Sequence, residues 1–281
     1  MNLGKWGVGM STQEYFAHIK NCVDLGITTF DHADIYGHYT TESEFGDALK
    51  HDKSLRSKIQ LISKCGICLV TPNRPLHRIK HYDTTKTHIL SSVEQTLENL
   101  GTDYLDLLLI HRPDPLMDPS EIAEAFSILK SSGKVLHFGV SNFTVSQLTL
   151  LHSYFPIEFH QYEASILHTK SFYDGVGDAC MTMGIKSQAW SPLAAGRLHN
   201  NSEDERTRRV LAMSSILAEK YGVSFDQILI SWLQKHPAKI VPVVGTTKIE
   251  RLKSAKEAIQ INLTREEWHM LLRASNGFDV P

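Results

Sequence analysis

The stretch "LDLLLIHRPDPLMDPSEIAEAFSILKSSGKVLHFGVS", residues Leu105–Ser141, gives the clearest structural signal in the chain. It begins with a run of large aliphatic residues and ends with a second β-rich run, Val135–Ser141, and both are typical of strands. Between them, Asp118 followed by Pro119 marks a helix start, because aspartate caps the first turn and proline suits the first helical position. A segment of this length is not a hairpin turn, so the two strands are expected to run parallel.

The same alternation recurs along the whole chain. We expect strands at Leu3–Gly7, Ile27–Asp31, Ile59–Lys64, Leu105–Ile110, Val135–Ser141, Ile157–Gln161, Ile185–Trp190 and Lys239–Val244. Strand and helix alternating eight times favours a parallel sheet closed into a (β/α)8 TIM barrel, which takes roughly 250 residues. The sequence therefore predicts an α/β fold with a single barrel domain over residues 1–281. Pro242 does not suit the last predicted strand, Lys239–Val244, because proline cannot donate a hydrogen bond to a strand ladder.

Five helix starts match the capping-box spacing, in which a hydroxyl and a Glu or Gln three residues later satisfy each other's backbone groups. They are Ser11–Glu14, Thr41–Glu44, Thr144–Gln147, Thr247–Glu250 and Thr264–Glu267. One predicted helix also shows an apolar face, formed by Ile89, Leu90, Val93, Leu97 and Leu100. Two long segments, residues 66–85 and 191–205, follow the third and seventh predicted strands, where the active-site loops of a barrel belong.

The composition limits the class of protein. A hydrophobic content of 42% supports a sizeable core, and a net charge of −2 with evenly spread charges favours neither nucleic acid nor an anionic membrane as a partner. The N-terminus lacks the pattern of a signal peptide, and the longest apolar runs are too short to span a bilayer. Four cysteines without a regular framework suit a reducing compartment, so we expect a soluble cytoplasmic protein. Cys65 and Cys68 have zinc or redox spacing but no second pair, so buried thiols are favoured and no metal site is expected.

Chemically active side chains gather at the predicted strand ends, where the active site of a barrel lies. Asp31 ends the second strand with Tyr36 just beyond it, Lys64 ends the third, and His111 follows the fourth. An acid, a phenol, an amine and an imidazole converging from successive strands indicate a catalytic site, although His111 alone would equally suit a core position. Asp34 is better explained structurally, as a cap on the turn before Tyr36.

Six segments carry a resemblance to a known family: "TTFDHADIYG", "LISKCG", "LDLLLIHRPDP", "HFGVSNF", "AWSPLAAGRL" and "VPVVGTTKIERL". Together they are similar to the motifs of the aldo-keto reductases, closest to the branch of soluble reductases, and the resemblance runs from about Leu3 to Pro281. It implies a (β/α)8 barrel that reduces an aldehyde or ketone to the alcohol with NADPH. The catalytic tetrad of the family would fall on Asp31, Tyr36, Lys64 and His111.

Physical chemistry supports these roles. A carbonyl that accepts hydride develops negative charge on its oxygen and needs a nearby proton donor, here Tyr36. A lysine ammonium about 4 Å from a phenol stabilises the phenolate by up to ~4 kcal/mol at an effective dielectric near 20. Asp31 would hold Lys64 charged and in place, and His111 would orient the carbonyl oxygen or help to relay the proton.

The expected cofactor is NADP(H). No complete G-x-G-x-x-G follows a strand, which argues against a Rossmann domain. Barrels instead bind phosphates after strands seven and eight, at a helix N-terminus. One segment that opens a helix capped at Thr247 fits this geometry. Its residues are Gly245, Thr246, Thr247, Lys248 and Arg251. The two cations, Lys248 and Arg251, suit a 2′-phosphate, although they would also suit a solvated helix face.

The resemblance implies the rest of the cofactor site. Ser141, Asn142 and Gln161 would hold the carboxamide, and Trp190 would stack on the nicotinamide unless it is merely a core aromatic. Ser191, Leu193 and Gly196 would line the pyrophosphate side. The sequence departs from the family at His160, where an asparagine usually precedes Gln161. The expected partner is a small carbonyl substrate. The alternative is a regulatory role, because barrels of this family also serve as cofactor-binding subunits of potassium channels.

Overall fold

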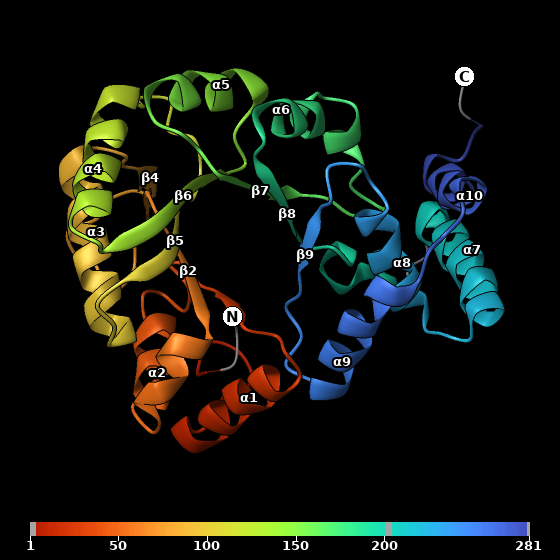
Figure 1. The fold of residues 1–281 in the computed structure, drawn as a ribbon, viewed down its shortest axis with the longest axis horizontal. Coiled ribbons are helices and arrows are strands. Elements are labelled where there is room, and N and C mark those ends of the chain that lie inside the picture. Colours follow the sequence, from red (N-terminus) through yellow and green to blue (C-terminus); the bar gives the residue numbers. More distant parts are fainter. Residues whose placement is uncertain (1–3, 200–203, 280–281) are drawn as a thin grey trace. The chain divides into compact units, whose positions relative to one another are not determined.

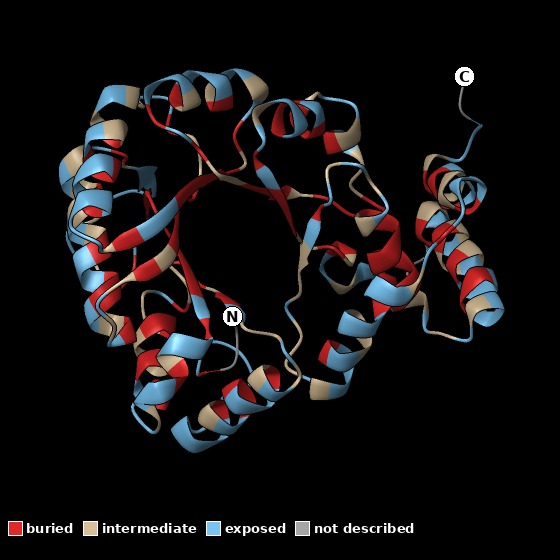
Figure 2. Cartoon of the chain, viewed as in Figure 1, coloured by how far each residue is buried: buried red, intermediate tan, exposed pale blue. Residues whose placement is uncertain are grey.

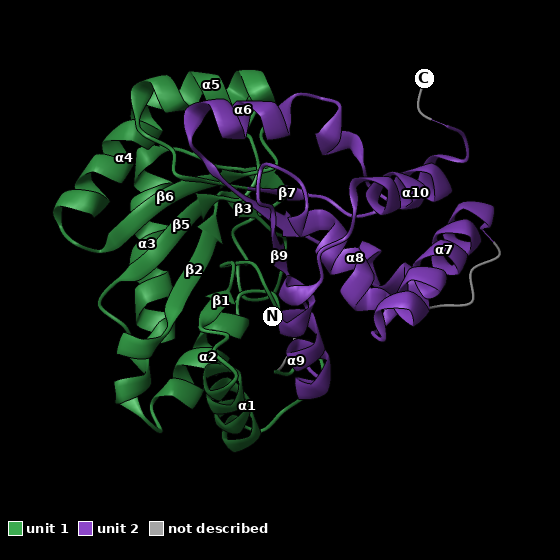
Figure 3. Ribbon diagram, turned by 45° about the vertical axis from the view of Figure 1, so that its right-hand side comes forward, with its two compact units in different colours: residues 1–160 green, residues 161–281 purple. Residues whose placement is uncertain are grey.

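The computed structural model describes residues 4–199 and 204–279. It divides the chain into two compact units, residues 1–160 and 161–281 (Figure 3). The boundary falls within strand β7 (Phe159–Glu163). The expectation of one domain over the whole chain stays a prediction.

The first unit alternates parallel strands with helices. Its parallel strands pair in the order β1 (Thr29–Asp31), β2 (Gln60–Cys65), β5 (Leu105–Ile110) and β6 (Val135–Ser141). Its helices are α1 (Thr12–Asp24), α2 (Thr41–Leu49), the 3₁₀ helix η1 (Lys53–Lys58), α3 (Lys86–Leu100), α4 (Pro119–Ser131) and α5 (Val145–Tyr154). Two short antiparallel strands, β3 (Ile67–Cys68) and β4 (His81–Tyr82), interrupt the segment between β2 and α3. In Figure 1, α3, α4 and α5 lie outside β2, β5 and β6.

Burial on both faces explains why β5 is a nearly continuous apolar run. Figure 2 shows buried residues along β2, β5 and β6 and on the helix faces turned toward them. Side chains of neighbouring strands pack against each other: Ile62, Leu107 and Leu109 form a core cluster, and Phe159 packs against it. Gly139 of β6 allows this close packing, because a Cβ there would lie 2.4 Å from the Phe159 carbonyl oxygen.

The first predicted strand is wrong. Leu3 lies outside the described residues, and residues 4–8 form a bend and a turn, in which the amides of Gly7 and Gly9 donate to the Gly4 carbonyl. Three glycines in six positions favour a tight turn over an extended strand. The other seven predicted strands are present, with ends displaced by up to two residues, and β5 and β6 have the predicted bounds.

Of the five predicted capping boxes, three are confirmed: those at Ser11, Thr144 and Thr264. The box at Thr41 is wrong, because α2 begins at that residue and its N-cap, Thr40, makes no side-chain bond to the helix. The box at Thr247 is also wrong, since the next helix has Lys248 as its N-cap. In both cases the spacing of the residues fits the motif, but the N-cap of the helix lies one residue before or after the predicted one.

The second unit holds the strands β8 (Lys186–Trp190) and β9 (Val241–Val243), which pair in parallel with Pro242 opposite Ala189. Its helices are η2 (Lys170–Phe172), α6 (Val176–Met183), η3 (Ala194–His199), α7 (Glu205–Tyr221), α8 (Phe225–Gln234), α9 (Ile249–Glu257), η4 (Ala258–Gln260) and α10 (Arg265–Asn276). The indoles of Trp232 and Trp268 stack 5.0 Å apart, and each donates to the other residue's carbonyl. This reciprocal contact joins α8 to α10.

Candidate active site

Lys64 is the centre of the candidate site. Its side chain is 1% exposed, and its ammonium donates to Asp31 Oδ2 at 2.6 Å and to the His32 carbonyl at 2.8 Å. The Tyr36 hydroxyl lies 3.4 Å from the same nitrogen. Burial opposes the charge, but Asp31 and Tyr36 outweigh it and raise the pKa of Lys64 above its ordinary value. The lysine is therefore a buried cation directed at a phenol.

Parallel register brings these residues together. Asp31 ends β1 opposite Ile62 of β2, so Lys64 lies two residues further along the neighbouring strand. The chain then turns sharply, with the Tyr36 amide donating to the Ala33 carbonyl at 3.1 Å. Consecutive left-handed residues at 37–39 carry the chain into α2. Leu69 anchors this turn, because its amide donates to the Tyr39 hydroxyl at 2.9 Å.

His111 faces the same phenol from the end of β5. Its ring lies edge-on to the Tyr36 ring, with centroids 5.9 Å apart. Burial, with the charge of Lys64 adding to it, lowers the pKa of His111 well below its usual value, so the imidazole is neutral. Its Nδ1 is buried with no hydrogen-bond partner among the described residues. The structure thus brings all four predicted catalytic side chains together within the first unit.

Trp6 is a site residue that the sequence reasoning missed. Its indole stacks on the Tyr36 ring, with centroids 5.8 Å apart and planes 17° from parallel, while about half of its surface stays exposed. The segment that carries it was predicted as a strand, and only its true turn places the indole over the phenol. A tryptophan among glycines was the only signal available.

The predicted cofactor residues divide between the two units. In the first unit, Ser141 is buried at the end of β6, and the Asn142 amide donates to its hydroxyl at 2.6 Å. Asn142 has a φ of 62°, which asparagine tolerates better than most residues. In the second unit, the buried Gln161 amide donates to Gln188 at 3.2 Å, and Trp190 ends β8 half-buried.

The segment after β8 has an unusual backbone. Ser191, Ala194, Ala195 and Gly196 all have positive φ, and three of them are consecutive. Leu193, half-buried, accepts a hydrogen bond from the Gly196 amide at 3.2 Å. Left-handed residues in succession turn neighbouring amides toward one side, as in the concave backbone turns that bind anions.

The predicted phosphate segment lies between β9 and α9. Gly245 and Lys248 are exposed, Thr246 and Thr247 are half-buried, and the Thr246 hydroxyl accepts from the Lys248 amide at 3.2 Å. Arg251, on the first turn of α9, is exposed and acts electrostatically on Asp226. A helix N-terminus flanked by two cations suits a phosphate.

A carboxyl pair lies next to the tetrad in the first unit. Asp34 and Glu42 both line a cavity of about 250 Å³. Glu42 is buried and accepts from the Ser63 hydroxyl at 2.6 Å. No motif pointed to this pair, because the two acids lie eight residues apart, Asp34 in an irregular turn and Glu42 at the start of α2.

No group of three or more metal-ligating side chains in residues 4–199 and 204–279 is arranged to hold a metal ion. All four cysteines are buried and none forms a disulfide, Cys65 and Cys68 included. Within the same residues, no helix combines the length and apolarity needed to cross a membrane.

Comparison with known proteins bears on this site. The model of the Aldo/keto reductase family matches residues 1–276. The chain belongs to the aldo/keto reductase family. It is an oxidoreductase of that family and has its (β/α)8 barrel fold. The resemblance and the fold class predicted from the sequence are thereby confirmed.

Relatives within the aldo/keto reductases cover nearly the whole chain. "Uncharacterized oxidoreductase YcsN" of Bacillus subtilis is 47% identical over 281 residues, which cover 99% of this chain and 93% of the relative. "6-dehydroglucose reductase" of Agrobacterium fabrum is 40% identical over 283 residues, covering 99% and 94%. A crystal structure of an aldo/keto reductase from Klebsiella pneumoniae in complex with NADP and acetate aligns with a TM-score of 0.74 at 26% identity, covering 93% of this chain and 85% of that one.

Proposed function

We propose that this aldo-keto reductase reduces an aldehyde or ketone to the alcohol with NADPH, and that Tyr36 is the proton donor. The observation that carries the proposal is the buried Lys64 ammonium, 2.6 Å from Asp31 and 3.4 Å from the Tyr36 hydroxyl. A buried cation beside a phenol favours proton release to a developing alkoxide.

When bound, NADPH would supply the hydride that the carbonyl carbon accepts. The carbonyl oxygen takes the proton of the Tyr36 hydroxyl as its negative charge develops, and the Lys64 ammonium stabilises the phenolate that remains. Asp31 keeps the ammonium in position, and solvent then returns the proton to Tyr36. The neutral His111 retains an N–H that donates to the carbonyl oxygen and fixes its orientation.

The residues assigned to NADP(H) fit it chemically. The succession of left-handed residues at 194–196 offers backbone amides to a pyrophosphate. Lys248 and Arg251, at the start of α9, offer charge to a 2′-phosphate. By family resemblance, Ser141, Asn142 and Gln161 would hold the carboxamide, and Trp190 would stack on the nicotinamide.

The name of one relative supports a class of substrate. Because a 40% identical relative is named a 6-dehydroglucose reductase, we include sugar aldehydes among the carbonyl compounds proposed for this chain. The test is an NADPH-oxidation screen across simple aldehydes, ketones, quinones and a hexose oxidised to the aldehyde at C6. Cofactor deuterated at C4 should deliver deuterium to the product carbinol carbon. Absence of turnover across this panel, with cofactor bound, would contradict the proposal.

A further inference from the structure

A buried imidazole holds the backbone just beyond the end of β6. His160, on β7, and Phe143 are 0% and 2% exposed, and the Phe143 amide donates to His160 Nε2 at 3.1 Å. Both residues belong to the first unit. Phe143 lies two residues after Ser141, the last residue of β6, so its amide lies outside the strand. The imidazole therefore provides the acceptor that a buried backbone amide requires.

The bond lies next to a residue with an unfavourable backbone conformation. Asn142, immediately before Phe143, has a φ of 62°, in the left-handed region that costs free energy for residues other than glycine. Such a conformation persists where the surrounding contacts hold it. The chain is held by β6 before Asn142 and by the capping box of α5 at Thr144 after it. The bond to His160 holds the chain between these two anchors.

Two side chains of this segment form the carboxamide site of the proposed function. Ser141 is buried, and its hydroxyl accepts from the side-chain amide of Asn142 at 2.6 Å, so the hydroxyl proton is left for another acceptor. Asn142 also carries an amide oxygen, which accepts. A carboxamide has one carbonyl oxygen and one NH₂ group, so the pair offers it both a donor and an acceptor. Rotation of the backbone at Asn142 would move these two groups apart.

We propose that His160 is a positioning residue for the cofactor: by holding the Phe143 amide it fixes the backbone of Asn142, and so keeps Ser141 and Asn142 in place for the carboxamide of NADP(H). This inference rests on the proposed function. The role requires a neutral imidazole, because a protonated Nε2 cannot accept. Burial lowers the pKa of His160 to about 3, which keeps the ring neutral near neutral pH.

The experiment compares two ligands that share an adenosine 2′-phosphate. NADP⁺ carries the nicotinamide carboxamide, whereas adenosine 2′,5′-bisphosphate lacks the nicotinamide half altogether. Calorimetric titration of the whole protein gives the ratio of the two affinities without any turnover. His160→Leu keeps an apolar volume but has no acceptor, so it should weaken NADP⁺ binding by at least ~10-fold and leave bisphosphate binding within ~2-fold. An unchanged ratio in a folded His160→Leu protein would overturn the proposal.

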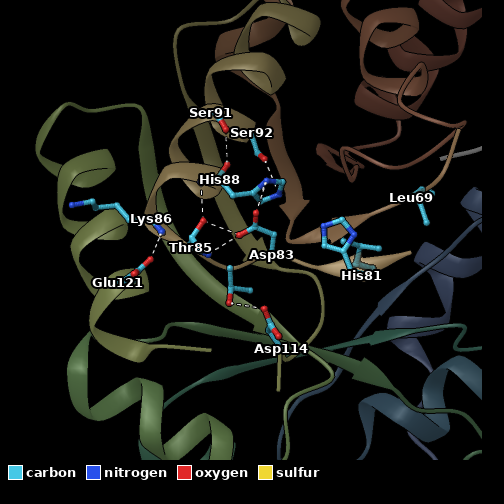
Figure 4. Close-up of polar contacts among 12 residues, drawn as sticks. Leu69, His81, Asp83, Thr85, Lys86, His88, Ser91, Ser92, Asp114 and Glu121 are labelled. Carbon is cyan, nitrogen blue, oxygen red and sulfur yellow. Dashed lines mark hydrogen bonds and ion pairs between the residues drawn. The ribbon is translucent and has the colours of Figure 1, made fainter. Parts of the chain in front are cut away.

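Two further variants separate positioning from stability. His160→Asn keeps a side-chain oxygen that can accept from the Phe143 amide and should keep the wild-type ratio. Thr85→Ala removes a helix cap elsewhere in the first unit: the Thr85 hydroxyl accepts from the His88 amide at 3.3 Å and donates to Asp83 at 2.7 Å (Figure 4). It should lower the melting temperature and leave the ratio unchanged. A ratio lowered by Thr85→Ala, or by His160→Asn as far as by His160→Leu, would overturn the proposal.

Asn142→Ala distinguishes failure of this inference from failure of the proposed function. It removes a carboxamide contact directly, so it should lower the ratio of NADP⁺ affinity to bisphosphate affinity. A ratio lowered by Asn142→Ala but not by His160→Leu would overturn the positioning role and leave the carboxamide site intact. An unchanged ratio in both variants would contradict the carboxamide site, and this inference with it.

The donor can be removed in place of the acceptor if the His160 variants do not fold. Phenyllactic acid incorporated at Phe143 keeps the benzyl side chain and replaces the backbone N–H by an ester oxygen. This protein should lose NADP⁺ affinity as expected for His160→Leu, although His160 itself is unchanged. A wild-type ratio in the ester protein would overturn the proposal.

Discussion

The Lys64 ammonium lies 3.4 Å from the Tyr36 hydroxyl, although 28 residues separate them in the chain. A fully buried cation costs free energy unless it is paired, and Asp31 provides that pairing at 2.6 Å. The buried Lys64 charge lies where it can act on the Tyr36 hydroxyl, the proposed proton donor. This relationship is the basis of the first two predictions.

Replacing Tyr36 by Phe should lower the reduction rate by at least ~10²-fold, because the ring is kept and only the proton donor is lost. The melting temperature should stay close to that of wild type. Steady-state kinetics and calorimetry check the two parts, and Tyr82→Phe, at an exposed tyrosine of β4, is the matched control. Near-normal turnover of an aldehyde by the Phe variant, with hydride transfer rate-limiting, would remove Tyr36 from the mechanism.

Lys64→Met should abolish reduction while cofactor binding persists, because the ammonium acts on Tyr36 and the methionine fills a similar volume. Loss of the charge removes the ammonium that pairs with the Asp31 carboxylate, so the melting temperature should also fall. Rates of NADPH oxidation and cofactor fluorescence titration measure these effects separately. A folded variant that retains a tenth or more of the wild-type rate would refute the assignment.

Arg251→Ala should weaken NADPH binding by roughly tenfold, about 1.4 kcal/mol, and leave NADH binding unchanged. The reason is that the guanidinium at the start of α9 would meet only the 2′-phosphate. Wild type should bind NADPH at least ~10-fold more tightly than NADH, as fluorescence titration would measure. Lys253→Ala removes the same charge from α9 and should affect neither cofactor. Equal wild-type affinities for the two cofactors would contradict this prediction.

His160 should make the fold sensitive to acid. Burial lowers its pKa to about 3, and its Nε2 accepts from the Phe143 amide at 3.1 Å, a bond that protonation breaks. A depressed pKa means that its contribution to stability is complete above the unfolded value, about 6.5, and is lost as pH falls toward about 3. Over that window the free energy of unfolding should fall by up to ~1.4 kcal/mol per pH unit.

Urea denaturation at several pH values measures this slope. His160→Asn preserves an acceptor for the Phe143 amide without a titrating ring, so its stability should depend less steeply on pH. His137, an exposed histidine beside Glu158, offers the control substitution His137→Asn. Identical slopes for wild type and His160→Asn would show that His160 does not titrate on unfolding.

The two kinds of error in the predicted elements have local backbone causes. A capping box forms only where its first residue has the backbone angles of an N-cap. The spacing at Thr41 fits the box, but α2 already begins at Thr41, so that Thr40 is the N-cap. The first predicted strand fails because Gly4, Gly7 and Gly9 favour a turn. By contrast, β5 could be predicted to the residue, because an apolar run buried on both faces leaves a strong local pattern.

The sequence by itself determined the alternation of strands and helices and the chemical identity of the tetrad, because both are written in local patterns and in the order of residues at strand ends. Only the tertiary structure decided that Trp6 stacks on Tyr36 and that Asp34 shares a cavity with Glu42. These contacts depend on the register of neighbouring strands and on left-handed turns, and no spacing along the chain encodes them. The protonation of Lys64 and His111 was decided there too, because burial and the distance between charges exist only in the folded chain.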